Sequence, residues 1–197
     1  MDKITLQRLN KDSYYGNIAL QIAQRSTCLR RKYGAIIVND DRIVSTGYNG
    51  APRGTLNCND IGMCLREMMK IPHGERYELC RSVHAEANAI INASPVEMNG
   101  ATLYLAGWDV VVNEDGSVNK FNQLRKVESC AMCKRMIINA GIGFVVYFST
   151  YPDIINVQDW IEHDTSLCLP ESTPEYKQAV ESAIDFCVYG KTKYEDL

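Results

Sequence analysis

The chain has 197 residues, a formal net charge of −3 and 46% hydrophobic residues. This length suits one domain with elaborations, because a core of such a size can bury about 70% of the surface that the unfolded chain exposes. The slightly acidic balance argues against a protein that wraps a polyanion, so nucleic acid is not an expected partner. No segment is apolar enough to span a membrane and residues 1–30 contain no apolar signal segment, so we expect a cytoplasmic protein without membrane contact whose eight cysteines are reduced.

The first part of the chain predicts a helix, a hairpin and a long loop. Asp12 or Ser13 is the expected N-cap of a helix, and residues 34–38 and 42–47 are expected to form two strands around a turn at 39–41. The apolar residues of the helix recur at i, i+3 and i+4, namely Tyr15, Ile18, Ala19, Ile22 and Ala23. Residues 48–83 show little hydrophobic periodicity, and loops of such length are usually functional or held by something.

The second part alternates helices with strands. A helix is expected after His84 and ends near Pro95, and a second opens at Cys130 and ends near Gly141. Each precedes an apolar strand, residues 102–106 and 144–148, and this alternation predicts that the two strands are parallel. The fold class that follows is a three-layer α/β/α sandwich.

Two further segments lie outside this pattern. Residues 108–128 contain three consecutive valines and an Asp-Gly pair, which predicts an inserted hairpin. We expect it to fold over the active site and to bring Trp108 close to a ligand there. The tail from residue 151 holds a second predicted helix, from Thr173 to about Gly190, whose apolar face must pack on the core or on a second subunit.

The residue types that carry chemistry are His84, Glu86, Cys130 and Cys133. One imidazole and two thiolates fill three positions of a tetrahedral zinc and leave the fourth to water, and an unligated carboxylate, Glu86, would then activate that water. Both motifs open a helix, whose positive dipole end favours thiolate over thiol. A redox pair or half of a structural zinc site is the alternative interpretation of the two cysteines.

Several segments together resemble the deoxycytidylate (dCMP) deaminase family, in particular its bacterial and phage branch. The resemblance covers residues 12–150 and is carried by residues 25–35, Gly47-Tyr48-Asn49-Gly50-Ala51-Pro52-Arg53-Gly54, residues 75–80 and His84-Ala85-Glu86. The His-x-Glu and Cys-x-x-Cys motifs match the signature of zinc nucleobase deaminases, except that Ser129 replaces a proline. We expect this serine, a good N-cap residue, to satisfy the amides of the cysteine helix through its hydroxyl.

The resemblance implies a mixed sheet of about five strands, a homo-oligomer between dimer and hexamer, and zinc-dependent conversion of dCMP to dUMP, feeding dTMP synthesis. It also implies dCTP and dTTP as effectors, with Mg²⁺ accompanying the effector. We expect a single deaminase domain over residues 1–197, with its core at about 12–150, the inserted hairpin at about 108–128 and a C-terminal helical extension at about 151–197.

By the same resemblance, Asn49 contacts the substrate, the backbone of Ala85 contacts the base and Glu86 shuttles protons. Two groups could bind the phosphate: the cations Arg30, Arg31 and Lys32, and Arg53 in the turn between Gly50 and Gly54, a possible effector or phosphate loop. Helix C-terminal cations that balance the dipole, and a turn without ligand, are the respective alternatives.

Four further cysteines precede His84. Members of the family place a structural zinc at the positions of Cys28 and Cys58, and Cys64 and Cys80 could complete the set, with His73 as a rival for the fourth position. Cysteines that serve only as small packing residues are the alternative.

Two other functions stay open at this point. The first is a deaminase of another nucleotide, a nucleoside, a free base or a tRNA adenosine. The second is an inactive, zinc-scaffolded nucleotide-binding module, against which the presence of Glu86 argues, since a structural zinc would not require it.

Overall fold

The structure is a computed structural model that describes residues 8–72, 75–112, 118–123, 126–150 and 152–163. In chain order the elements are α1 (Lys11–Ala23), β1 (Arg31–Asn39), β2 (Arg42–Tyr48), α2 (Cys58–Ile61), α3 (Leu65–Met68), a 3-10 turn η1 (Tyr77–Leu79), α4 (Ala85–Ile91), α5 (Pro95–Met98), β3 (Thr102–Val112), β4 (Val118–Gln123), α6 (Ala131–Asn139), β5 (Phe144–Phe148), β6 (Asp153–Asn156) and α7 (Val157–His163).

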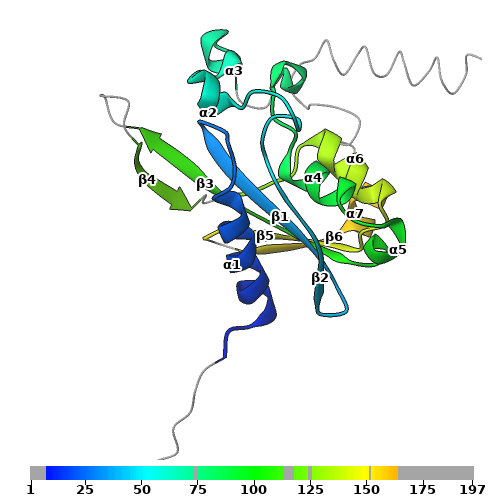
Figure 1. The fold of residues 1–197 in the computed structure, drawn as a ribbon. Helices are drawn as coiled ribbons and strands as arrows, with labels where there is room; N and C mark the ends of the chain where they lie inside the picture. The colour runs from blue at the N-terminus through cyan, green and yellow to red at the C-terminus, as the bar shows by residue number, and fades with distance from the viewer. Residues whose placement is uncertain (1–7, 73–74, 113–117, 124–125, 151, 164–197) are drawn as a thin grey trace, which may run out of the picture. The chain divides into compact units, whose positions relative to one another are not determined.

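The strands form one mixed sheet in the order β2-β1-β3-β5-β6, and β4 pairs with the far end of β3 (Figure 1). The pair β3 and β5 is parallel, with Leu105 opposite Tyr147, and the other pairs are antiparallel. This arrangement confirms the predicted parallel strands and the mixed sheet, and it adds β6, which the sequence analysis placed in a helical tail.

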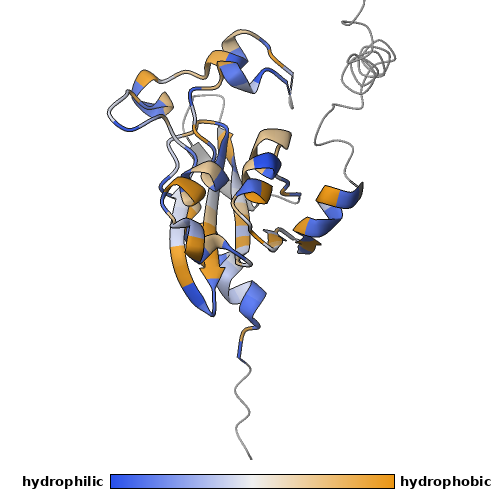
Figure 2. Ribbon diagram, turned by 90° about the vertical axis from the view of Figure 1, so that its right-hand side faces the viewer, coloured by the Kyte–Doolittle hydropathy of each residue, from blue (hydrophilic) through white to orange (hydrophobic). Residues whose placement is uncertain are grey.

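Helices cover both faces of the sheet, which confirms the three-layer sandwich. α1 packs on β1, β3 and β5, whereas α4 packs on β2 and β1 and contacts α6, which in turn contacts α7. Figure 2 shows hydrophobic residues recurring along the strands, as expected for a sheet that is buried on both faces. The largest fully buried side chains lie on β1, β3, β5 and α6, among them Ile36, Leu105, Ile137 and Val146.

Two glycines let the helices approach the sheet closely. A Cβ atom on Gly34 would lie 2.1 Å from the backbone oxygen of Ala19 in α1. A Cβ atom on Gly47 would lie 2.3 Å from the backbone oxygen of Ala85 and from the backbone nitrogen of Ala89, both in α4. β2 therefore fixes the position of α4 through direct backbone contact.

Several predicted boundaries differ from the structure. The N-cap of α1 is Asn10, whose Oδ1 accepts a hydrogen bond of 2.7 Å from the backbone N–H of Ser13, and neither Asp12 nor Ser13 is the cap. The expected loop at 48–83 contains α2, α3 and η1, and Gly50 pairs with Val83 in an isolated bridge. The predicted helix from Thr173 to Gly190 lies outside the described residues.

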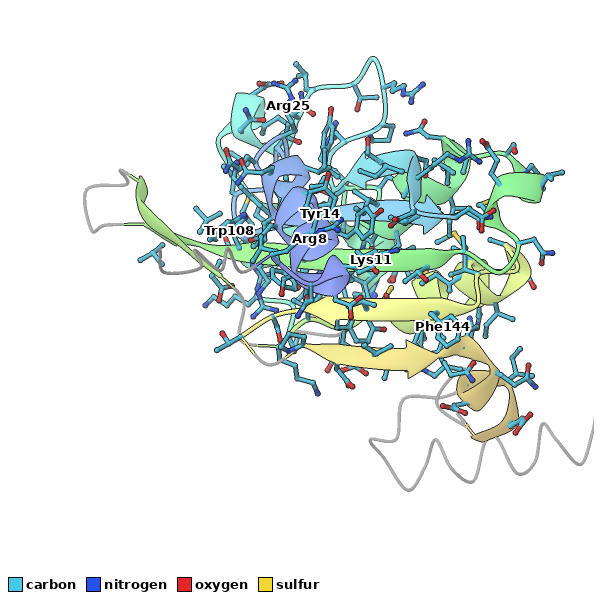
Figure 3. All side chains as sticks on the ribbon, turned by 90° about the horizontal axis from the view of Figure 1, so that it is seen from below. Arg8, Lys11, Tyr14, Arg25, Trp108 and Phe144 are labelled. Carbon is cyan, nitrogen blue, oxygen red and sulfur yellow. The ribbon has the colours of Figure 1, made fainter. Side chains whose placement is uncertain are left out.

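The hairpin predicted at residues 108–128 exists as the outer half of β3 and β4, with Val110 opposite Phe121. The side chain of Trp108, however, lies against α1: its Nε1 donates a 3.0 Å hydrogen bond to the backbone oxygen of Leu20, and Figure 3 shows it beside that helix. The expectation that Trp108 lies over the ligand site is therefore wrong, because its indole packs on the α1 face of the sheet and the motif residues lie on the α4 face.

No helix among the described residues combines the length and the apolar composition needed to cross a lipid bilayer.

Candidate metal centre and substrate pocket

The predicted metal ligands come together at the start of two neighbouring helices. His84 is the N-cap of α4 and Cys130 is the N-cap of α6, so each residue lies immediately before the first turn of its helix. Cys133 follows in the first turn of α6 and is buried. The Sγ atoms of both cysteines lie 3.4 Å from Nδ1 of His84.

These separations fit a tetrahedral zinc. With zinc bonds of about 2.3 Å to sulfur and about 2.0 Å to nitrogen, a tetrahedral angle puts the two ligand atoms about 3.5 Å apart. Within the parts of the chain that the structure describes, His84, Cys130 and Cys133 are the only group of three or more such side chains whose ligand atoms all lie within 4.8 Å of one another. The residues present thus fit a three-ligand zinc centre with one open position.

The surroundings of the cysteine pair favour a thiolate. A hydrogen bond from Cys133, helped by the neighbouring imidazole of His84, lowers the pKa of Cys130 to about 4. The pKa of Cys133 is raised by its bond to Cys130 and by burial, so Cys130 is the more acidic of the two thiols. A divalent cation would complete the deprotonation, because thiolates are the form that binds metal.

Glu86 is buried in the same pocket as the predicted metal ligands. It lies in the first turn of α4, is 4% exposed and belongs to the lining of the same pocket as His84 and Cys130. Burial raises the pKa of Glu86, opposed in part by the charge of His84. A carboxyl group whose pKa is moved toward neutrality can both accept and return a proton.

Ser129 stands where the deaminase signature has proline, and the structure shows how the exchange is accommodated. It precedes the N-cap Cys130 and is 3% exposed, and its hydroxyl caps no amide of α6 among the described residues but lies beside the carboxyl group of Glu86 and the hydroxyl of Tyr147. The expected capping by this hydroxyl is therefore wrong. Its backbone N–H, which a proline would lack, instead donates a 3.1 Å hydrogen bond to the hydroxyl of Tyr147 on β5.

The pocket beside the metal ligands carries a strong charge contrast. Its lining consists of Cys28, Arg30, Arg31, Tyr33, Asn49, Cys64, Arg66, Tyr77, Cys80, Ser82, His84, Ala85, Glu86, Leu105, Glu128 and Cys130. The charged residues in this lining are three arginines, Arg30, Arg31 and Arg66, and two glutamates, Glu86 and Glu128. Such a pocket suits a ligand with an anionic end and a polar, uncharged end.

Of the four cationic residues expected to bind the phosphate, two line the pocket and two do not. Arg30 and Arg31 line the pocket, where they pair with Glu67 at 2.9 Å and Asp109 at 3.0 Å. Lys32 is not in the lining, and its Nζ donates to the backbone oxygen of Ser26. Arg53 is not in the lining either.

Arg53 attaches the 50–54 turn to α4, and Gly50 attaches it to the residue that precedes His84. Arg53 donates a 2.8 Å hydrogen bond to Oδ1 of Asn92, at the end of α4. Gly50 exchanges two backbone hydrogen bonds with Val83, and Gly54 has a φ of +80° in open space. This turn supports the segment that leads into His84.

Asn49 and Ala85 both face the pocket, as expected. Asn49 is buried, and its amide bridges the backbone of β1, accepting from the N–H of Tyr33 at 2.7 Å and donating to the oxygen of Arg31 at 2.9 Å. One amide hydrogen and one lone pair remain for a ligand. Ala85 is the first residue of α4, so its N–H has no partner within the helix.

The sequence analysis missed Arg66, Tyr77 and Glu128. Arg66 in α3 and Tyr77 in η1 come from the long loop, and Glu128 precedes the cysteine motif by two residues. The available signal for Arg66 was its position two residues after Cys64, in a loop whose length already indicated a functional role. No pattern pointed to its burial.

The four other cysteines lie in one region but do not form a closed site. Cys58 is buried, and Cys28, Cys64 and Cys80 all line the pocket. The pKa of the Cys58 thiol is raised first by burial and then by these three neighbours. His73, the alternative ligand, lies outside the described residues.

Comparison with known proteins identifies the class. Residues 9–149 match the family described as the cytidine and deoxycytidylate deaminase zinc-binding region, and the chain belongs to this family. A deoxycytidylate deaminase of Mycobacterium phage D29 is 35% identical over 147 residues, which cover 72% of this chain and 97% of the phage protein. A deoxycytidylate deaminase of Schizosaccharomyces pombe is 33% identical over 141 residues, 71% of this chain but only 37% of the yeast protein.

Among solved structures, the apo dCMP deaminase of cyanophage S-TIM5 is 25% identical and aligns with a TM-score of 0.45, covering 69% of this chain and 80% of that one.

Proposed function

We propose that this protein catalyses the zinc-dependent hydrolytic deamination of dCMP to dUMP and ammonia. The observation that supports this most directly is the buried Glu86 beside a three-ligand set, in one pocket with the guanidinium groups of Arg30 and Arg31. Relatives named deoxycytidylate deaminases support the choice of substrate. The chain spans little more than a third of the yeast relative but nearly all of the phage relative, so the phage protein is the more appropriate comparison.

The proposed roles follow from the positions of the side chains. Zinc held by His84, Cys130 and Cys133 would supply an activated water near neutral pH. Glu86 would accept one proton from the attacking water and pass it to N3 of the pyrimidine. It would then take the proton left on the new C4 hydroxyl and deliver it to the amine, so that the C4–N bond breaks and ammonia leaves. Asn49 and the N–H of Ala85 orient the base, and the arginines hold the phosphate end.

A panel assay separates this function from its alternatives. Zinc-loaded protein is incubated with dCMP, deoxycytidine, cytosine, an adenine nucleotide, a guanine nucleotide and a tRNA carrying adenosine, and ammonia release is measured. Preference for dCMP over deoxycytidine supports the proposal. Turnover of another substrate would assign the protein to a different deaminase, and no turnover at full zinc occupancy would favour a binding module.

A structural zinc is part of the proposal. Cys28, Cys58, Cys64 and Cys80 lie close enough to influence one another, and a closed thiolate site would hold the 48–83 segment, which has few buried apolar residues. Freshly purified, reduced protein should contain two zinc ions per chain, and Cys64→Ser or Cys80→Ser should contain one. A single zinc in the unmodified protein would remove this second site.

The remaining expectations rest on the family resemblance and on the length and composition of the chain. We propose a cytoplasmic homo-oligomer, a single deaminase domain over the whole chain, and regulation by dCTP and dTTP with Mg²⁺. Gel filtration with light scattering, with and without each nucleotide and Mg²⁺, tests the assembly and its response to the effectors.

A further inference from the structure

Arg66 differs from the other two arginines of the pocket in that no carboxylate of the described residues forms an ion pair with it. Arg30 and Arg31 each pair with a carboxylate, whereas within the described residues Arg66 makes no ion pair. Its bonds are donated by one terminal nitrogen, Nη2, to the backbone oxygens of Pro72, at 2.8 Å, and Glu75. Two neutral acceptors position this side chain without neutralising it.

The cation is also deeply buried. Arg66 is 6% exposed, and its Nε is buried with no hydrogen-bond partner in the described parts of the chain. A buried cation that contacts no carboxylate, and a buried N–H without acceptor, are both unfavourable. Such an arrangement persists where a ligand supplies the missing charge.

The geometry places this guanidinium within the length of one nucleotide from His84. Its central carbon lies 4.8 Å from the ring centroid of Tyr77, and the Tyr77 ring lies 5.4 Å from the imidazole of His84. These two separations put the guanidinium no more than about 10 Å from the imidazole. A nucleoside monophosphate spans that interval between its pyrimidine ring and its phosphate.

We propose that Arg66 is the anchor for the 5′-phosphate and therefore sets the preference for a nucleotide over a nucleoside. This inference rests on the proposed deaminase function and deepens it. Arg30 and Arg31, already paired with carboxylates, add positive potential, while Arg66 supplies the unneutralised charge. Tyr77 stacks on the guanidinium and holds its plane in place.

The test compares two substrates in one variant. Arg66→Met should lower kcat/KM for dCMP about ten- to hundred-fold more than kcat/KM for deoxycytidine, the range of a charge-assisted hydrogen bond, with the larger effect on KM. Inorganic phosphate should inhibit dCMP turnover competitively in the wild type, and much less in the variant. Arg42→Met, the same change at an exposed position on β2, should leave the ratio of the two substrates unchanged.

Equal losses on both substrates would overturn the proposal and limit Arg66 to holding Pro72 and Glu75 in place. Equal losses accompanied by loss of zinc would assign its charge to the cysteine cluster instead. Should Arg66→Met fail to fold, Arg66→Lys keeps the charge but not the planar fork, and it must still weaken phosphate inhibition. Failure of wild-type protein to deaminate dCMP would contradict the proposed function and is visible before any variant is made.

Discussion

The bond between Ser129 and Tyr147 allows a quantitative prediction about how this chain dispenses with the proline of the deaminase signature. The backbone N–H of Ser129 is buried, and the Tyr147 hydroxyl is its acceptor at 3.1 Å. Tyr147→Phe removes that acceptor and should lower the free energy of unfolding by about 1–3 kcal/mol, the cost of a buried, unsatisfied donor. In a Ser129→Pro background there is no N–H to satisfy, so the same change should cost about 1–2 kcal/mol less.

The assay is a double-mutant cycle by urea unfolding of zinc-loaded protein at one protein concentration. Tyr104→Phe is the matched control, because Tyr104 is equally buried, at 5% exposed, and its hydroxyl donates to Asp12 instead. Tyr104→Phe should cost the same in both backgrounds. Additivity within about 0.5 kcal/mol for Tyr147→Phe and Ser129→Pro would refute the reasoning.

Three further predictions concern the elements that support the site. Gly47→Ala should displace α4, whose backbone lies 2.3 Å from the added Cβ, and weaken zinc binding in a competition titration, whereas Gly54→Ala, strained by its φ of +80° but in open space, should cost stability without affecting zinc. Burial and the bond to Asp41 raise the pKa of Tyr15 to about 12. The stability that the protonated hydroxyl contributes is therefore complete below the unfolded pKa of about 10 and is lost as pH rises from 10 to 12. Tyr15→Phe should flatten that part of the curve of unfolding free energy against pH. Removing zinc with a chelator should abolish turnover and lower the melting temperature, and unchanged turnover in metal-free protein would contradict a metal-dependent reaction.

The parts of the site that could be predicted from sequence are those fixed by local rules. His84, Glu86, Cys130 and Cys133 sit at helix starts, and a ligand at an N-cap or in a first turn has a position that short-range geometry determines. The parallel pairing of residues 102–106 with 144–148 follows likewise from alternation of helix and strand. These features need no knowledge of distant contacts.

The features that sequence did not predict depend on long-range packing. Trp108 could face either side of β3, and only the bond to Leu20 places it against α1. The burial of Arg66 accompanies its contacts with Pro72 and Glu75, which leave no periodic signal in the sequence. The four residues of β6 are mostly exposed and show no alternation of buried and exposed positions, so only their pairing with β5 identifies them as a strand.

The central claim is that Glu86 transfers the protons of a zinc-dependent deamination of dCMP. The most direct measurement is the yield of dUMP and ammonia from dCMP, with zinc content determined on the same samples, for the wild type and Glu86→Gln. We expect equimolar dUMP and ammonia from the wild type, and turnover lower by about 10²–10⁴-fold in Glu86→Gln with zinc and fold retained. Near-normal turnover in Glu86→Gln, or loss of its zinc, would contradict the assignment of Glu86 as the proton carrier.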